Sequence, residues 1–314
     1  MMNVSKFLLL LRCPQSGETL QLKDRHIANL SGQYSYQIST SGIPLFGEQV
    51  CSPDARIQQQ HYEAIAKAYL QNLAYPHTQE YMDYLDRVLL AAVQDAHLGT
   101  VAEICCGRGE AFLLLGERVE RGVGVDISLS MLESAQTTLP NENLFFVQGD
   151  ATQLPLQSEA FDSVLMLGGI HHVRDRKKLF SEIFRILKPG GQFIFREPLS
   201  DFFLWRWLRA IIYRLSPALD HETERPLLYE ETVPILLDVG FQLSQWRSYG
   251  FLGFCFFMNS DVLVVNGLLR FIPGIRSLTR LVTQFDDWAV RLPVFKRAGL
   301  QVIGRADKPT YRAK

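Results

Sequence analysis

The chain has 314 residues, of which 47% are hydrophobic and 21% are charged, and its formal net charge is −1. This balance is typical of a globular protein with enough apolar residues for a core, and it excludes a global positive field that would attract nucleic acid. The length predicts one core with one or two appended parts.

Residues 1–52 are expected to form a small β-rich unit. The short apolar run at 7–11 predicts its first strand. Residues 20–22 and 34–38 alternate apolar and polar side chains with the period of two that strands show. Glycines and small polar residues between these segments supply the turns.

Residues 53–98 are rich in Gln, Ala, Tyr and Leu, and we expect a helical lid that is broken at Pro76. From residue 99 to residue 199, short apolar runs alternate with helical segments, which predicts a core with a parallel sheet and helices on both faces. The expected strands are 101–105, 122–126, 144–148, 161–167 and 192–197. The expected helices are 110–118, 129–138 and 177–187.

Two segments interrupt the alternation, an aromatic and basic one at 200–229 and one rich in Phe and Leu at 249–298. Between them, 230–248 continues the core with a helix and a strand, and 299–314 supplies the last core strand and a tail. The simplest interpretation is that both insertions cap the carboxyl edge of the sheet. Two sharper hypotheses are that they enclose a large apolar pocket, and that the basic aromatic face at 205–214 makes a peripheral contact with a membrane.

A turn with two glycines, Gly107 and Gly109, follows the first strand of the core. Glycine lets the backbone approach a ligand closely, and the start of the next helix offers free N–H groups to an anionic group. Asp126 lies 19 residues after Gly107 at the end of the next strand, where a carboxylate can accept the two hydroxyls of a ribose. These residues fit NAD and S-adenosylmethionine (SAM) equally.

Three further features favour SAM. Phe112 replaces the third glycine of the dinucleotide fingerprint, which keeps helix and strand close around a pyrophosphate. Gly149-Asp150 follows the third strand, where the carboxylate can accept an adenine amino group. Phe161-Asp162 opens the fourth strand, and Leu187–Gly191 precedes the fifth. In this order and spacing the motifs resemble those of the class I SAM-dependent methyltransferases, specifically the type 11 group that contains ubiquinone and menaquinone methyltransferases.

The resemblance is strongest over 101–197 and implies an α/β fold. The fold would be a Rossmann-like seven-stranded methyltransferase sheet with helical cap insertions and the small β-rich N-terminal domain. The resemblance also implies SAM as cofactor and S-adenosylhomocysteine (SAH) as product. The residues that it places around SAM are Glu103, Cys105, Gly107 and Gly109 at the methionine part, Asp126 at the ribose, Ile127, Met131, Asp150 and Ala151 at the adenine, and Leu167 and Gly168 near the sulfonium.

Methyl transfer from a sulfonium displaces a group that is already activated, so positioning and water exclusion carry much of the catalysis. A general base is needed only if the acceptor arrives protonated. His171 and His172 follow the fourth strand and are candidates because histidine titrates near neutral pH; the alternative is that the pair shapes its loop. Glu197, at the end of the fifth strand, is a third candidate, either as base or as ligand of an amine.

The N-terminal unit also resembles a small zinc ribbon of the Trm112 kind, through residues 11–14 and 42–46. Ser16 stands where that domain has its second cysteine. Because Cys13 and Cys51 are the only cysteines in this unit, a tetrahedral zinc site lacks ligands. We therefore expect a Trm112-like unit without metal, and no metal elsewhere.

The sequence thus predicts a SAM-dependent methyltransferase that acts on a largely apolar small molecule, such as a secondary metabolite, a lipid or a quinone-like compound. O-methylation is favoured over C- or N-methylation. The alternatives are a tRNA or protein methyltransferase, which the near-zero net charge disfavours, and a SAM-binding protein that does not methylate. The five cysteines suggest no disulfide framework, and no apolar run approaches the roughly 18 residues of a membrane span, so we expect a cytoplasmic protein. The oligomeric state and the identity of the acceptor are left open.

Overall fold

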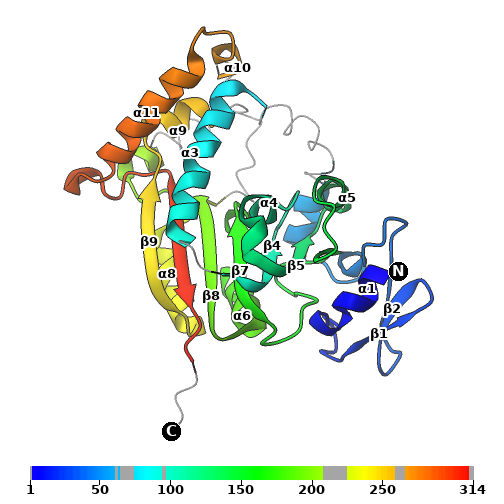
Figure 1. Ribbon diagram of the computed structural model, residues 1–314. Helices are drawn as coiled ribbons and strands as arrows, with labels where there is room; N and C mark the ends of the chain where they lie inside the picture. Colours follow the sequence, from blue (N-terminus) through cyan, green and yellow to red (C-terminus); the bar gives the residue numbers. More distant parts are fainter. Residues whose placement is uncertain are drawn as a thin grey trace.

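The computed structural model describes residues 2–60, 63, 74–93, 97–207, 225–258 and 266–310. Among these residues seven strands form one sheet, and β10 is antiparallel to both of its neighbours while the other pairs are parallel. The order across the sheet is β6 (Leu144–Gln148), β5 (Val119–Asp126), β4 (Gly99–Ile104), β7 (Phe161–Leu167), β8 (Leu187–Pro198), β10 (Gln301–Asp307) and β9 (Gln242–Tyr249) (Figure 1). The expected Rossmann-like seven-stranded sheet is confirmed.

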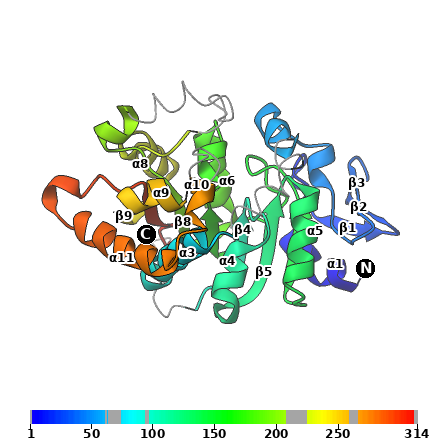
Figure 2. The same cartoon turned by 90° about the horizontal axis from the view of Figure 1, so that it is seen from above.

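Both faces of the sheet are covered, so its strands alternate between two buried layers (Figure 2). On β4, for example, Val101 packs with one layer and Ala102 with the other. One layer contains α6 (Arg176–Ile186), α8 (Tyr229–Val239) and the N-terminal unit. The other contains α3 (Pro76–Val93), α4 (Glu110–Leu115) and α5 (Leu129–Thr138).

Local pattern located most of these elements. The observed bounds of β6, β7 and α5 are those expected from the sequence. The predicted helix 110–118 is divided into α4 and a 3-10 turn, η3 (Gly116–Arg118). The strand expected at 192–197 begins earlier, because Leu187 already pairs with Phe161 and the residues up to Gly191 form a bulge before pairing with β7 resumes.

The N-terminal unit contains a three-stranded antiparallel sheet, β1 (Leu20–Lys23), β2 (His26–Asn29) and β3 (Ser35–Gln37). The first strand expected at 7–11 was wrong: α1 (Met2–Phe7) and the 3-10 turn η1 (Leu8–Leu10) occupy this region. The reason is that the buried side chains of Val4, Phe7 and Leu10 recur every three residues and pack together on the core. A five-residue apolar run carries no periodicity that separates helix from strand.

The expected Trm112-like ribbon stays a prediction. Cys13 is buried, and its Sγ lies 3.1 Å from Tyr36 Oη rather than beside a second thiol. No group of three or more His, Cys, Asp or Glu side chains that could hold a metal ion occurs among the described residues.

The second insertion forms a helical cap with α3. It contains α9 (Leu252–Phe257), α10 (Asn266–Leu269), α11 (Ile275–Ala289) and the 3-10 turn η5 (Pro293–Phe295). In the described part of the first insertion, Trp205 points inward and donates its Nε1–H to Ala298 O at 2.7 Å, whereas Trp207 is exposed.

Parts of the expected lid and of both insertions lie outside the described residues. They are 61–73, apart from residue 63, and 94–96 in the lid, 208–224 in the first insertion and 259–265 in the second. No helix in the described ranges combines the length and the apolar character that crossing a membrane requires.

Packing of the N-terminal unit onto the sheet gives a stability prediction. Phe7 is fully buried, and its ring stacks on Phe145 of β6 with 5.2 Å between centroids. Phe7→Ala should therefore lower the free energy of unfolding by about 3–5 kcal/mol in a denaturant titration. Leu9→Ala is the matched control, because Leu9 is 82% exposed. Equal midpoints for the two variants would show that the unit does not contribute to the core.

Candidate active site

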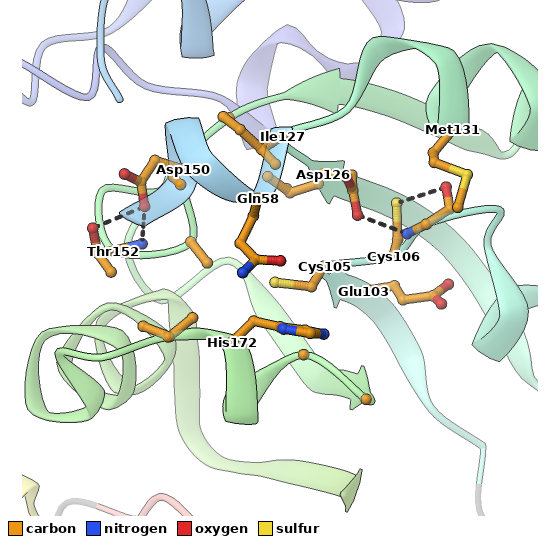
Figure 3. A pocket seen from close by; sticks show the side chains of 18 of the residues that line it. Gln58, Glu103, Cys105, Cys106, Asp126, Ile127, Met131, Asp150, Thr152 and His172 are labelled. Atoms are coloured by element: carbon orange, nitrogen blue, oxygen red, sulfur yellow. Dashed lines mark hydrogen bonds between the residues drawn. The ribbon is translucent and has the colours of Figure 1, made fainter. Parts of the chain in front are cut away.

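A cavity of about 230 Å³ lies at the carboxyl ends of the parallel strands, where open α/β sheets bind ligands (Figure 3). Its wall is built from the segments that follow four strands: 105–108 after β4, 126–127 after β5, 149–152 after β6 and 167–169 after β7. The helical segment 53–60, which we call the lid segment, supplies the remaining side.

Ten of the eleven residues that the sequence assigned to SAM line this cavity. They are Glu103, Cys105, Gly107, Asp126, Ile127, Met131, Asp150, Ala151, Leu167 and Gly168. Gly109 is the exception: it precedes α4 with a φ of 76°, and a Cβ there would lie 2.7 Å from Leu139 Cδ1. Its place in the structure is therefore the tight turn into α4.

Asp126 holds the glycine loop while it faces the cavity. Its Oδ2 accepts the N–H of Gly107 at 2.8 Å, and its Oδ1 accepts the N–H of Ser128 at 2.9 Å. Loss of water raises the pKa of Asp126, and these N–H donors oppose that rise. Because a carboxylate oxygen has two lone pairs, each oxygen keeps one acceptor site for a ligand hydroxyl.

Glu103 is buried beneath the same loop. It accepts the N–H of Ala111 at 2.9 Å and that of Phe112 at 3.2 Å, which satisfies donors in the first turn of α4. Burial raises the pKa of Glu103 to about 8. The side chain thus fixes the start of α4 relative to β4, and it reaches the cavity from below the glycine loop.

Asp150 connects the core to the lid segment. Its Oδ1 accepts the N–H and the hydroxyl of Thr152, and its Oδ2 accepts the N–H of Ser52 at 2.7 Å. Ser52 caps the first turn of the lid segment by accepting the N–H of Ala55. The sequence signal that could have located this start is Ser52 followed by Pro53, since serine is favoured before a helix and proline in its first turn.

Gln58 of the lid segment is a site residue that sequence reasoning missed. Its side chain is only 7% exposed, and the amide points into the cavity toward Cys105 and His172 (Figure 3). Within the described part of the chain its Oε1 has no hydrogen-bond partner. Buried polar atoms are normally hydrogen-bonded, so this amide oxygen suits a ligand that donates a hydrogen bond.

Glu197 lies behind the cavity wall and does not line it. Its Oε1 accepts the N–H groups of Gly169 and Ile170 at 2.7 and 2.8 Å, and its Oε2 lies 2.9 Å from His171 Nδ1. The side chain is fully buried, which raises its pKa to about 7. The geometry therefore favours a positioning role for Glu197 in place of the base or amine ligand expected from the sequence.

The two histidines also differ in whether they line the cavity. His172 lines the cavity, whereas the His171 ring is held by Glu197. The two rings are in contact, with 3.8 Å between their centroids and a tilt of 39° between their planes. Of the three residues considered for proton transfer, His172 is the one that lines the cavity.

The cavity also has the empty space that a nucleoside needs. Gly107 and Gly168 adopt φ values of 51° and 76°, and a Cβ at either position would meet nothing within 4 Å. Both glycines line the cavity, so a side chain at either would project into the ligand space. This backbone, with the free acceptor sites of Asp126, fits SAM.

Comparisons with known proteins agree with this site. Residues 102–195 match the methyltransferase domain family, by its description "Methyltransferase domain". Among curated proteins, the demethylmenaquinone methyltransferase of Leptospira interrogans is 32% identical over 175 residues, which covers 48% of this chain and 70% of that relative.

Solved structures show the fold. The [4+2]-cyclase SpnF superposes with a TM-score of 0.58 and 18% identity over 83% of this chain and 98% of its own. A chain in the complex of the Haloferax volcanii Trm112 methyltransferase activator with a methyltransferase superposes with a TM-score of 0.56 and 18% identity, covering 82% of this chain and 99% of that one. At this identity the likeness concerns the fold alone.

The raised pKa of Glu197 predicts a pH-dependent stability. Its pKa rises from 4.5 to about 7 on folding, so between these values the folded chain keeps a proton that the unfolded chain has released. Stability should fall as the pH rises through this window, by up to roughly 1.4 kcal/mol per pH unit from this group. Glu197→Gln keeps the acceptor for Gly169 and Ile170 and should remove that part of the slope. The measurement is the unfolding free energy at pH 4.5–7.5; parallel profiles for the two proteins would contradict the assignment.

Gln58 gives a binding prediction. Gln58→Leu removes the unpartnered amide oxygen at nearly constant volume, and we expect SAM to bind about tenfold more weakly in calorimetry, the loss of roughly one hydrogen bond. Gln60→Leu is the matched control, because Gln60 lies on the exposed side of the same segment. Equal affinities of the two variants would remove Gln58 from the site.

Proposed function

The chain belongs to the type 11 family of SAM-dependent methyltransferases, and we propose that it transfers the methyl group of SAM to a quinone-like, largely apolar aromatic acceptor. The observation that carries the choice of acceptor is the relative from Leptospira interrogans, a demethylmenaquinone methyltransferase that this chain matches over 70% of its length. The chain is an enzyme whose methyl donor is SAM and whose donor product is SAH.

We assign the donor site to the cavity residues. Gly107 and Gly168 leave room for the donor, and Asp126 offers acceptor sites to ribose hydroxyls. Gln58 of the lid segment offers its amide oxygen as a further hydrogen-bond acceptor. SAM supplies a methyl group that is already activated on a sulfonium. The work of the chain is therefore to align donor and acceptor and to exclude water, and the lid segment is suited to exclude it because Asp150 anchors its start over the cavity.

We propose that His172 receives a proton from the acceptor. A phenolic or quinol hydroxyl must lose its proton before its oxygen or its ring carbon attacks a methyl group, and His172 lines the cavity beside the loop 167–169. His171, held by Glu197, would keep the neighbouring His172 ring in place through the contact between the two rings. In O-methylation this proton transfer completes the exchange of hydrogen for methyl. In C-methylation the ring carbon must also lose its hydrogen as a proton, while the oxygen regains the proton held by His172. The preference for O-methylation stays a prediction.

The alternatives from the sequence have weaker support. One alternative is a chain that binds SAM without methylating. The superposition with SpnF, named as a [4+2]-cyclase, is relevant to it because this fold also occurs in a protein named for other chemistry. A tRNA or protein acceptor would need a favourable charged surface, and the net charge is −1. The cytoplasmic location, the oligomeric state and the domain limits stay predictions or open.

The proposed function is tested by incubating the chain with methyl-labelled SAM and a prenylated naphthoquinol in detergent micelles. We expect label in the organic-extractable product, and mass spectrometry of that product distinguishes O- from C-methylation. Asp126→Ala should weaken SAM binding and abolish transfer. His172→Ala should lower the transfer rate roughly 100-fold or more while SAM affinity is retained. Label found only in RNA or protein, or none while SAM is bound, would overturn the proposal.

A further inference from the structure

Helix α11 departs from an ordinary surface helix, because it buries several polar side chains and exposes several large apolar ones. The residues that it buries include the polar Thr279, Thr283 and Asp286. The residues that it exposes include a stripe of four large apolar side chains, each between 43% and 63% exposed and spaced three or four positions apart. We call these four the α11 face: Leu278, Leu281, Phe285 and Trp288.

Contacts on the buried side fix this orientation. Asp286 accepts the hydroxyl hydrogen of Tyr81 at 2.7 Å and the N–H of Gly253, so it ties α11 to α3 and α9. Arg280 and Glu80 form a second link between α11 and α3 at 2.9 Å. Rotating α11 so that the α11 face pointed inward would break these hydrogen bonds and this ion pair. The exposure of the α11 face therefore follows from the packing of the helix.

The segment before α11 adds further apolar surface. Leu268, Phe271 and Ile272 are all exposed, at 62%, 68% and 42%. The backbone N–H of Ile275 bonds to Ile272 O, which joins this segment directly to the first turn of α11. Monomeric proteins seldom expose large contiguous apolar patches, and such patches mark interaction sites.

The charges around the α11 face are mostly positive, even when Glu80 of α3 is counted with them. Residues 266–300 contain six basic and two acidic residues, a net charge of +4 in a chain whose total is −1. Glu80, which pairs with Arg280 and lies 4.0 Å from Arg276, lowers the sum for the segment from +4 to +3. All six basic side chains are exposed: Arg270, Arg276, Arg280, Arg291, Lys296 and Arg297. Of the two acids, Asp286 is buried and Asp287 pairs with Arg291. An apolar stripe bordered by cations is complementary to a partner whose outer layer is anionic and whose interior is apolar.

We propose that the α11 face docks on an anionic phospholipid bilayer, with its apolar side chains in the headgroup region and the surrounding cations on lipid phosphates. A second copy of the chain is a poorer occupant, because a twofold contact would set the +4 segment against itself. The membrane contact expected at 205–214 stays a separate prediction: Trp205 is buried, Trp207 is exposed, and 208–214 lie outside the described residues. The inference does not depend on which acceptor is methylated.

The position of the cap gives this docking a use. Helix α9 follows directly on Tyr249, which pairs with Gln301, and Gln301 also pairs with Pro198 at the carboxyl end of β8. The cap therefore stands at the end of the sheet where the parallel strands finish, which is also the end that carries the cavity (Figure 1). A bilayer on the α11 face would lie near the side of the enzyme that receives an apolar acceptor.

Co-sedimentation of the full chain with lipid vesicles tests the inference without donor or acceptor. We expect binding to phosphatidylcholine vesicles that contain phosphatidylglycerol, weaker binding to phosphatidylcholine alone, and loss of binding as salt rises. The double variant Leu281→Asp and Trp288→Asp should partition about tenfold or more weakly, because two interfacial anchors are replaced by anions. Leu30→Asp is the control, because Leu30 is equally exposed in the N-terminal unit.

The double variant should bind SAM as the parent chain does, which shows that it is folded. Failure of the parent chain to sediment with anionic vesicles would overturn the inference. A concentration-dependent dimer that the double variant abolishes would overturn it too, in favour of a second copy. Vesicle binding without methyl transfer to the naphthoquinol would leave the inference standing and remove the proposed acceptor.

Discussion

Satisfaction of buried carboxylates by backbone N–H groups is the constraint on which the rest of the site depends. Three of the carboxylates that end or follow the parallel strands, Glu103, Asp150 and Glu197, are almost fully buried, and Asp126 stands in the cavity wall. A buried carboxylate is costly unless it is hydrogen-bonded. Each of the four accepts two or more N–H groups from an adjacent loop or helix start. The hydrogen bonds that compensate for the burial of these carboxyl groups therefore also hold the neighbouring backbone in place.

This arrangement explains why the cavity is shaped before a ligand arrives. Asp126 and Glu103 hold the two ends of the glycine loop, Glu197 holds the loop that bears His171 and His172, and Asp150 holds the start of the lid segment. Methyl transfer depends on alignment within a dry site, and rigid loops supply that alignment. Glu103, which lines the cavity, and Glu197, which lies behind its wall, both have raised pKa values, and this links the geometry of the site to pH.

The cap uses the same device away from the cavity. Asp286 is buried in α11 and is satisfied by the hydroxyl of Tyr81 and the backbone of Gly253. Because the hydrogen-bond partners of Asp286 lie inside the cap, the four apolar residues of the α11 face are exposed. One buried carboxylate thus sets the rotation of the helix, and the rotation determines which surface the cap presents beyond the sheet.

The sequence by itself determined the features that depend on neighbours along the chain. Periodicity placed β6, β7 and α5. The motifs between Gly107 and Gly191 carried the resemblance to SAM-dependent methyltransferases, and that resemblance implied the fold and ten residues of the cavity wall. Tertiary structure alone decided whether the apolar run at 7–11 became helix or strand. It also decided that His172 and Gln58 line the cavity, and that α11 exposes four large apolar side chains. These outcomes depend on partners that are distant in the chain, such as Ser52 and Asp150 or Tyr81 and Asp286. A local pattern records the chemistry of a side chain but not the direction from which its partner comes.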